Sequence, residues 1–385
     1  PTELVKRGVI VVTVNYRLGA LGFTAHPALT AETNGQTSGN YGFQAQQAAL
    51  RWVQRNIRNF GCDPDNVTIF GESAGGVSVY THLASPASAG LFHRAIAQSG
   101  TYAFAAPQTT RAAAEVNGQA FATALGCAAG DLACMRAAPV STVLSKQSTS
   151  PVAYLPNIDG SLLPQATLVL LGTGQFNRVP VLQGTTHDEY RLFVATLFEL
   201  QGNPVTTANY PLAIQAALGV NAATADALAN IFYTVDEYET ASLALGELGT
   251  DAIFACPSRQ LARSMIAYVP MYLYEFSDQN APQDVLPPVS FPYGAYHGAE
   301  VQYLLDSQDG AAAFTSAQTS LANHMKNYWT QFAKTGNPNG GTSPAWAVFV
   351  HRADNNFQQL IAPTPAPSSD DSWLLDHGCN FWNGF

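Results

Sequence analysis

Runs of apolar residues alternate with stretches in which apolar residues recur at helical spacing along the first part of the chain. Val9–Asn15 is a β-branched run, which predicts a strand buried on both faces of a parallel sheet. Tyr41–Phe60 has the apolar periodicity of a helix, Val67–Phe70 predicts a short buried strand, and Val77–Leu83 predicts a helix. This alternation indicates a parallel sheet with helices on its faces.

The same alternation continues through the rest of the chain. Further strands are predicted at Arg94–Gln98, Val179–Gln183 and Met271–Phe276. The Ala-rich ranges Leu212–Phe232 and Ser242–Ala267 predict helices, which we expect to cover one end of the sheet.

The C-terminal part differs in composition from the rest. Residues 362–369 are rich in Pro and Ser, so no regular structure is expected there. The aromatic residues Trp373, Phe381 and Trp382 follow, and we expect this tail to dock them against the body of the protein. Because there is no internal repeat and no long low-complexity linker, we expect a single α/β domain over residues 1–385.

Composition and charge limit the classes of partner. The chain is 47% hydrophobic, which is enough for a sizeable core. A net charge of −10 without any run of Lys or Arg argues against binding to nucleic acid or anionic membranes, and favours a neutral or weakly polar small molecule as substrate. No apolar stretch approaches the roughly 20 residues that cross a bilayer, so no membrane span is predicted.

The five cysteines fall into two groups. Cys127 and Cys134 lie close together in a Gly/Ala-rich stretch, where a small disulfide loop can form in an oxidising compartment. For Cys62, Cys256 and Cys379 we expect buried thiols rather than a disulfide.

The sequence Gly71-x-Ser73-x-Gly75 directly follows a predicted strand and precedes a predicted helix, which is the context that a nucleophilic serine on a sharp turn requires. Glycines two residues to either side let the flanking backbones pack closely. The same turn directs the amide of Ala74 toward the position of a developing oxyanion. We therefore interpret Ser73 as a nucleophile.

A serine hydroxyl needs a histidine to take its proton, and the histidine needs a carboxylate to orient it. In sites of this kind the acid and then the histidine follow the serine along the chain. Among the eight histidines, His297 lies in a Gly-flanked loop, 294–298, downstream of the predicted strand Met271–Phe276. Spacing alone does not distinguish His297 from an ordinary loop histidine.

Two carboxylates compete for the role of the acid. Asp188 and Glu189 both follow the predicted strand Val179–Gln183, and spacing does not choose between them. His187 beside them has no second metal ligand at a suitable spacing, so we expect neither a metal site nor a cofactor.

Several longer segments carry a family resemblance: Asn15–Gly19 with Gly22-Phe23, Gly39–Gly42, Ala49–Val53, Asp63–Thr68, Phe70–Gly76, Leu91–Ile96 with Gln98–Gly100, Asp188-Glu189, His297-Gly298-x-Glu300 and Trp329–Pro338. In these segments the chain resembles the type-B carboxylesterases, which include cholinesterases, fungal lipases and bacterial para-nitrobenzyl esterases. The resemblance runs nearly from end to end.

The resemblance implies an α/β-hydrolase fold, with a mostly parallel central sheet, helices on both faces and helical insertions near the active-site mouth. It implies a catalytic triad of Ser73, Glu189 and His297 that hydrolyses carboxylic esters through an acyl-enzyme. It further suggests that Glu72 and Ser99 form a polar shell near the triad, with Ser99 hydrogen-bonding among Glu189 and His297.

The resemblance also bears on the cysteines and on the oxyanion hole. It implies a Cys127–Cys134 disulfide and with it a secreted or extracytoplasmic location. Family members supply further oxyanion donors from a His-Gly-Gly type loop that precedes the strand equivalent to Val9–Asn15. The chain starts at Pro1, after that loop, so we expect the remaining oxyanion donors upstream of Pro1 and a catalytic domain that is incomplete at its N-terminus.

The substrate is less well defined by the resemblance. Leu192 stands where cholinesterases place an aromatic residue that meets quaternary ammonium, so choline esters are not expected. Phe193 is expected to line the acyl pocket. Small to medium neutral esters are the expected substrates, and the alternatives are a lipase acting on longer acyl chains and a catalytically impaired or non-enzymatic binding homologue.

Overall fold

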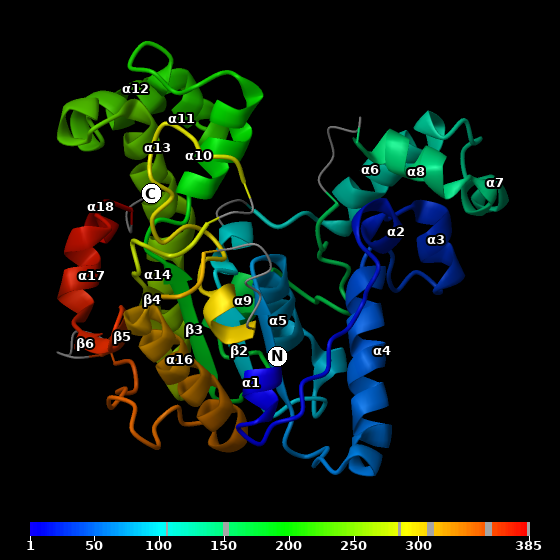
Figure 1. Cartoon of the computed structure of the whole chain (residues 1–385). Coiled ribbons are helices and arrows are strands. Elements are labelled where there is room, and N and C mark those ends of the chain that lie inside the picture. Colours follow the sequence, from blue (N-terminus) through cyan, green and yellow to red (C-terminus); the bar gives the residue numbers. More distant parts are fainter. Residues whose placement is uncertain (105–106, 149–153, 284–285, 306–311, 351–355, 383–385) are drawn as a thin grey trace.

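The fold is built on one twisted sheet, shown in Figure 1 as a computed structural model that describes residues 1–104, 107–148, 154–283, 286–305, 312–350 and 356–382. Within these ranges the sheet has six strands in the order β1-β2-β3-β4-β5-β6. Strands β1 to β5 are parallel and β6 is antiparallel to β5. The strands are β1 (Thr68–Glu72), β2 (Arg94–Gln98), β3 (Val181–Thr186), β4 (Met271–Phe276), β5 (Phe357–Leu360) and β6 (Ala366–Ser368).

The four predicted strands from Val67 to Phe276 are confirmed. Strands β2 and β4 have the predicted bounds, whereas β1 and β3 end two and three residues later. In the register of the sheet, Glu72, Gln98, Gly184 and Tyr274 form one row across β1 to β4. Residues that follow this row therefore emerge at one edge of the sheet.

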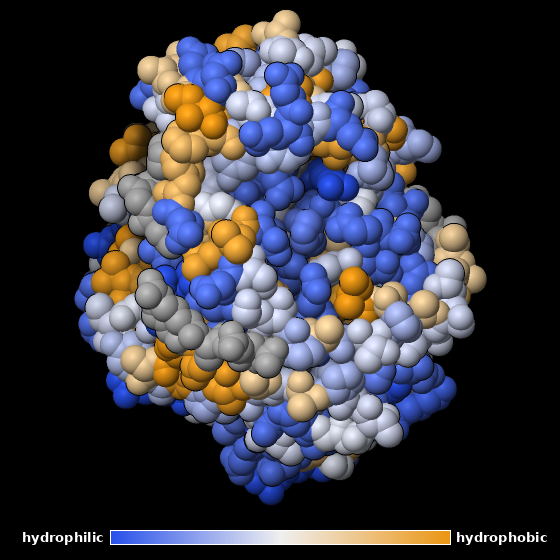
Figure 2. Space-filling view, turned by 90° about the vertical axis from the view of Figure 1, so that its left-hand side faces the viewer, coloured by the Kyte–Doolittle hydropathy of each residue, from blue (hydrophilic) through white to orange (hydrophobic). Residues whose placement is uncertain are grey.

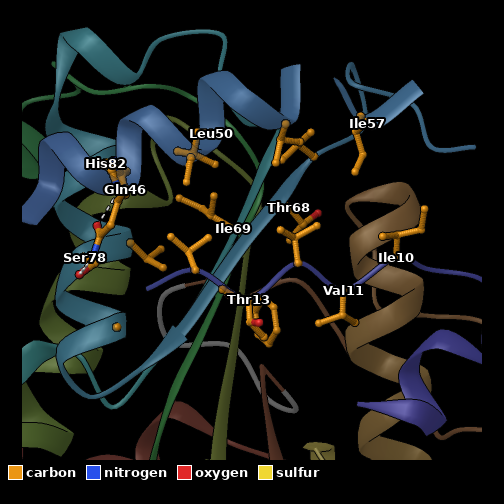
Figure 3. Close-up of a pocket in the computed structure, with 18 of the residues that line it drawn as sticks. Ile10, Val11, Thr13, Gln46, Leu50, Ile57, Thr68, Ile69, Ser78 and His82 are labelled. Atoms are coloured by element: carbon orange, nitrogen blue, oxygen red, sulfur yellow. Dashed lines mark hydrogen bonds between the residues drawn. The ribbon is translucent and has the colours of Figure 1, made fainter. Parts of the chain in front are cut away.

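The prediction of a strand at Val9–Asn15 is wrong. No described residue exchanges a backbone hydrogen bond with this segment, because it lies along β1 without pairing to it. Ile10, Val12 and Val14 keep 40–42% of their surface exposed, so the segment is not buried on both faces. A cavity of about 370 Å³ separates it from β1 and the helix α4 (Tyr41–Asn56) (Figure 3). β-branched residues favour a strand, but a strand also needs partner backbone groups.

The two faces of the sheet build two cores through the period of two along each strand. Ile96, Leu182, Tyr272 and Tyr274 pack with the helix α16 (Ser316–Thr335). Their neighbours along the strands face a second core, which is formed with α5 (Ala74–Ala84), α9 (Thr167–Gly172) and α14 (Cys256–Met265). Helices thus cover both faces, as expected.

The helical region after β3 lies above the carboxyl end of that strand in Figure 1 and contains α10 (Arg191–Leu197) to α13. The predicted helix Leu212–Phe232 is divided into α11 (Tyr210–Leu218), α12 (Ala222–Ala227) and the π-helical η5 (Leu228–Phe232), because the chain turns at Gly219 with a φ of 67°. The predicted helix Ser242–Ala267 is one continuous helical stretch. It consists of α13 (Ala241–Gly249), a π-helical segment η7 (Thr250–Ala255) and α14.

The remaining helices lie mainly N-terminal to β3. They are α1 (Thr2–Val5), α2 (Gly19–Phe23), α3 (Pro27–Glu32), α6 (Arg111–Ala124), α7 (Leu132–Ala137) and α8 (Val140–Ser148), with α15 (Val301–Leu305) between β4 and α16. Helices α2, α6 and α8 pack on one another at the side of the molecule farthest from β6 (Figure 1).

The C-terminal tail is more regular than its composition suggests. Within residues 362–369, where no regular structure was expected, Ala366–Ser368 forms the edge strand β6. An edge strand tolerates Pro367 because its outer side needs no ladder hydrogen bond. The tail continues as α17 (Asp370–Asp376) and α18 (Cys379–Trp382), and Trp373 is buried against Phe357, which confirms the expected docking of the aromatics.

The cysteine predictions have different outcomes. A disulfide joins Cys127 to Cys134, and Cys62 is a partly buried free thiol. The prediction of buried thiols for Cys256 and Cys379 is wrong, because the docked tail brings them together as a disulfide across 123 residues. Local spacing carries no information on a pairing of this length.

The molecular surface on the side of α17 and β6 is mainly polar. Apolar residues there form small separate groups among polar ones (Figure 2). Among the described residues, no helix combines the length and apolar character that crossing a membrane requires.

We predict that the two disulfides contribute unequally to stability. By the chain-entropy argument, the bond that closes 123 residues stabilises the fold by about 5 kcal/mol, and the bond that closes 7 residues by about 2.5 kcal/mol. The double variants C256A/C379A and C127A/C134A should therefore lose unequal free energy of unfolding in urea titrations. Equal losses would contradict the assignment of the long-range disulfide as the dominant cross-link.

Candidate active site

The turn between β1 and α5 holds Ser73 in a conformation that L-residues rarely adopt, with φ 56° and ψ −119°. Such strain costs about 1–3 kcal/mol and persists only where surrounding structure imposes it. Here the amide of Ser73 donates to the carbonyl of Gln98. A Cβ atom on Gly71 would lie 2.5 Å from the backbone of Gly75, so the tight turn requires the first glycine. At Gly75 itself there is room for a side chain.

The structure brings Ser73, His297 and Glu189 together, although 224 and 108 residues separate the pairs. His297 Nε2 lies 2.8 Å from Ser73 Oγ, and His297 Nδ1 lies 2.5 Å from Glu189 Oε2. Glu189 follows β3, is fully buried, and accepts a hydrogen bond of 2.9 Å from the amide of Thr186 through its other oxygen. His297 lies in the loop between β4 and α15. A serine, an imidazole and a carboxylate in this order can transfer a proton away from the hydroxyl.

Asp188, the other candidate acid, has a different set of contacts. Its Oδ2 accepts a hydrogen bond of 2.7 Å from the amide of Ala295, and its own amide donates to the carbonyl of Ala295. Arg191 pairs with its Oδ1 at 2.8 Å. Asp188 therefore ties the loop of Glu189 to the loop of His297. The sequence places the two carboxylates side by side but contains no signal for this contact across 107 residues.

The charge state of His297 is set by its carboxylate neighbours. Burial opposes protonation, but the negative charge and hydrogen bond of Glu189, with the charges of Glu72 and Glu300, raise the pKa of His297 to about 9. Glu72 Oε1 lies 3.3 Å from His297 Nε2. Burial raises the pKa of Glu72 to about 7 despite the opposing effect of His297.

The predicted polar shell is only partly present. Glu72 contacts His297 as described, but the buried Ser99 Oγ has no hydrogen-bond partner among the described residues. The predicted hydrogen bonds of Ser99 to Glu189 or His297 are therefore absent. The backbone of Ser99 has a φ of 50°, and its N–H donates a hydrogen bond to the carbonyl of Gly184. Glu300 was not expected to act here, yet it is fully buried, accepts from Gln98 Nε2 at 2.9 Å, and contributes its charge to His297.

Of the expected oxyanion donors, Ala74 lies among the described residues, as the first residue of α5. Pro1 itself is exposed and precedes α1. Its carbonyl accepts hydrogen bonds of 3.1 Å from the amides of Leu4 and Val5, and α1 contacts α15 and α16. The backbone of Pro1 thus starts a short helix, and the donors upstream of it stay a prediction.

Two phenylalanines lie against the imidazole ring of His297. The ring centroids of Phe193 and Phe254 are 5.1 Å and 5.2 Å from that of His297, and the two phenylalanines stack on each other at 5.8 Å. Leu192 is partly buried against the same core. The sequence indicated Phe193 and Leu192 but not Phe254, which comes from the distant η7.

The cavity at the edge of β1 is a separate feature. Gly75, Ser78 and His82 line one end of it, but none of Ser73, Glu189 and His297 does. The chemistry of the side chains, rather than the volume of a cavity, therefore locates the candidate active site.

Comparison with known proteins agrees with this geometry. The family model for the carboxylesterase family matches residues 1–382. The chain belongs to the carboxylesterase family. It is 35% identical to the pyrethroid hydrolase Ces2e of Rattus norvegicus, in a match that covers 91% of the chain and 62% of that protein. It is 34% identical to the cocaine esterase of Homo sapiens, in a match that covers 97% of the chain and 66% of that protein.

A solved structure supports the same family and its α/β-hydrolase fold. The structure titled PNB esterase superposes with a TM-score of 0.76 at 28% identity, and the match covers 97% of the chain and 76% of that protein. The chain spans 62% of the length of the rat pyrethroid hydrolase, which is less than two thirds.

We predict that the charge of Glu72 contributes to the raised pKa of His297. In the variant Glu72→Gln a negative charge 3.3 Å from Nε2 is lost, so the imidazolium is less stabilised and the pKa of His297 should fall. Histidine NMR titration measures this directly. His324, which lies on α16, serves as the internal control whose titration should not move. An unchanged or higher pKa of His297 would refute this account.

Proposed function

We propose that this chain carries the catalytic triad of a carboxylic ester hydrolase, with Ser73 as nucleophile, His297 as general base and Glu189 as the acid that orients the base. The observation that carries the proposal is the continuous contact from Ser73 Oγ through His297 to Glu189, with distances of 2.8 Å and 2.5 Å. The names of the relatives, an esterase and a hydrolase, support the reaction class.

The reaction proceeds in two steps. In its neutral form His297 takes the proton of Ser73 as the Oγ attacks the ester carbonyl, and then donates that proton to the leaving alcohol, which leaves an acyl-enzyme. In the second step His297 takes a proton from water as the water oxygen attacks the acyl carbon, and returns that proton to Ser73 Oγ as the bond to the serine breaks and the carboxylic acid is released. Glu189 stabilises the imidazolium that forms in both steps.

The amide of Ala74 is the donor to the oxyanion that we assign from this chain. Ala74 is the first residue of α5, so its N–H has no partner within the helix. The partial positive charge at the helix N-terminus adds to the stabilisation of negative charge there. Together with the strained turn, this places charge stabilisation next to the attacking oxygen.

The substrates that fit best are neutral esters of small to medium size. Phe193 and Phe254 lie against the ring of His297 and make that side of the site apolar. The carboxylate of Glu189 beside His297 and the net charge of −10 disfavour an anionic ester. Disulfides in the fold favour a secreted or extracytoplasmic location.

We predict that Ser73→Ala removes ester hydrolysis, by about 10⁶-fold in kcat if the serine acts as in other triads. The assay uses p-nitrophenyl acetate and butyrate, with the exposed Ser316→Ala as the matched control that keeps its activity. Retained turnover by Ser73→Ala would refute the assignment of Ser73 as the nucleophile. A wild-type chain that hydrolyses no ester would instead favour a binding homologue.

A covalent probe and a second substrate pair complete the test. A fluorophosphonate should attach to the peptide that contains Ser73, as detected by mass spectrometry, because it reacts with an activated serine. Hydrolysis of tributyrin in preference to triolein is expected for an esterase, and the reverse order would indicate a lipase acting on longer acyl chains.

A further inference from the structure

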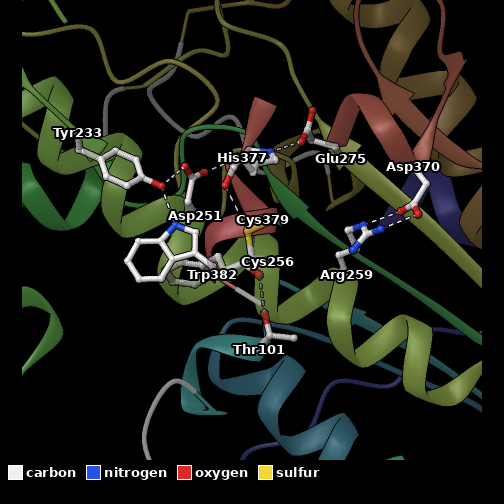
Figure 4. The surroundings of a disulfide bond; sticks show 11 residues. Thr101, Tyr233, Asp251, Cys256, Arg259, Glu275, Asp370, His377, Cys379 and Trp382 are labelled. Carbon is white, nitrogen blue, oxygen red and sulfur yellow. Dashed lines mark hydrogen bonds and ion pairs between the residues drawn. A yellow bond between two sulfur atoms is a disulfide. The ribbon is translucent and has the colours of Figure 1, made fainter. Parts of the chain in front are cut away.

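A second histidine outside the triad is held between two buried carboxylates. His377 Nδ1 lies 2.7 Å from Asp251 Oδ1, and His377 Nε2 lies 2.7 Å from Glu275 Oε1 (Figure 4). All three residues are at most 2% exposed. Burial opposes protonation of the ring, but the two carboxylates raise the pKa of His377 well above its usual range. Both ring nitrogens of His377 therefore lie within hydrogen-bond distance of a carboxylate.

This cluster is not available to a metal ion. Glu247, Asp251 and His377 lie close enough to one another to bind one. However, both ring nitrogens of His377 already have a carboxylate partner, and Asp251 Oδ2 accepts from the hydroxyl of Tyr233 at 2.8 Å. The groups satisfy one another, which is typical of a structural role.

The cluster joins three segments that are far apart in the sequence. Asp251 lies on η7, Glu275 on β4, and His377 between α17 and α18. The Cys256–Cys379 disulfide joins the first residue of α14, which directly follows η7, to the first residue of α18, two residues after His377 (Figure 4). We call His377, Asp251, Glu275 and this disulfide the His377 clamp.

The segment held by the clamp carries one of the aromatic walls of the active site. Phe254 lies three residues after Asp251 and two before Cys256, is 1% exposed, and has its ring centroid 5.2 Å from that of His297. Its carbonyl accepts from Thr101 Oγ1 at 3.1 Å. A π-helical turn is rarely stable by itself, so its shape at η7 depends on anchors of this kind.

A second route connects the clamp to His297. The ring of His187 lies 5.6 Å from that of His377, and His187 Nδ1 lies 3.1 Å from Asp188 Oδ1. Asp188 in turn binds the amide of Ala295, two residues before His297. The contacts through Phe254 and those through His187 and Asp188 thus both lead from His377 to the imidazole of His297.

We propose that His377 is a positioning residue: the His377 clamp fixes η7, so that Phe254 holds the ring of His297 in line with Ser73 and Glu189. This inference rests on the proposed function. The imidazole must keep Nδ1 toward Glu189 and Nε2 toward Ser73, and an aromatic wall on its face prevents rotation of the ring and excludes water. A displacement of about 1 Å at such a group can lower the rate by about 100-fold.

The test compares His377→Gln with a control that breaks a neighbouring ion pair. Arg259 on α14 pairs with Asp370 on α17 at 2.5 Å and 2.6 Å, and both are 1% exposed (Figure 4). Arg259→Gln thus removes a buried ion pair between α14 and α17, and no residue of η7 is changed. Both variants are assayed on p-nitrophenyl butyrate at a temperature where circular dichroism shows them folded.

We expect His377→Gln to lower kcat about 10- to 100-fold with KM changed less than about 3-fold, whereas Arg259→Gln keeps kcat within about 2-fold. Phe254→Leu leaves the clamp intact and should reproduce the loss in kcat, so it decides the question if His377→Gln does not fold. Equal losses in His377→Gln and Arg259→Gln, or an unchanged kcat in Phe254→Leu, would overturn the proposal.

A spectroscopic measurement separates this proposal from the proposed function. The proton between His297 Nδ1 and Glu189 should give a low-field NMR resonance, which we expect to weaken in His377→Gln and Phe254→Leu and to persist in Arg259→Gln. This measurement does not require turnover. A resonance that persists unchanged in His377→Gln and Phe254→Leu would overturn the positioning role. Retained turnover by Ser73→Ala would overturn only the catalytic assignment.

Discussion

The position of Ser73 Oγ is the constraint to which the rest of the site is fitted. The backbone of Ser73 is confined to a left-handed conformation between β1 and α5, and the close approach of Gly71 to Gly75 leaves the turn little freedom. The serine therefore cannot move to meet its partners. Glu189 and His297 must instead be brought to it by loops that leave other strands at the same edge of the sheet. A contact of Asp188 between these loops is one means by which they keep a common position.

Buried histidines in this protein differ in charge according to their partners. His297 and His377 face carboxylates, and the pKa of each is raised because the negative charges outweigh the effect of burial. His82 is buried against the neutral groups of Gln46 and Ser88, and burial lowers its pKa to about 4. The same side chain thus has a raised pKa in one place and a lowered pKa in another. An interior with few charged residues can carry imidazolium only where a carboxylate is buried with it.

Local pattern was sufficient for strands β1 to β4, whereas β5 and β6 were not predicted although they pair within the sheet. Strands β1 to β4 and the turn at Ser73 could be predicted from apolar runs of about five residues, because such runs are typical of strands buried in a parallel sheet. Val9–Asn15 has the same local signal but no partner among the described residues, so it is not a strand. Contacts between distant segments had no such signal. Glu189 and Asp188 were equivalent by spacing; the family resemblance indicated Glu189, and Glu189 is the one that contacts His297.

The Cys256–Cys379 disulfide also has no local sign in the sequence, because it follows from docking of the C-terminal tail. The same docking places His377 between two buried carboxylates. Removal of one buried charge from such a cluster leaves the others uncompensated, so the tail and η7 have to keep their positions together. The geometry around His297 is therefore set partly by the strained turn at Ser73, which is local in sequence. The other part depends on a tail more than a hundred residues from η7, and variation there can change the alignment of the base without changing the triad.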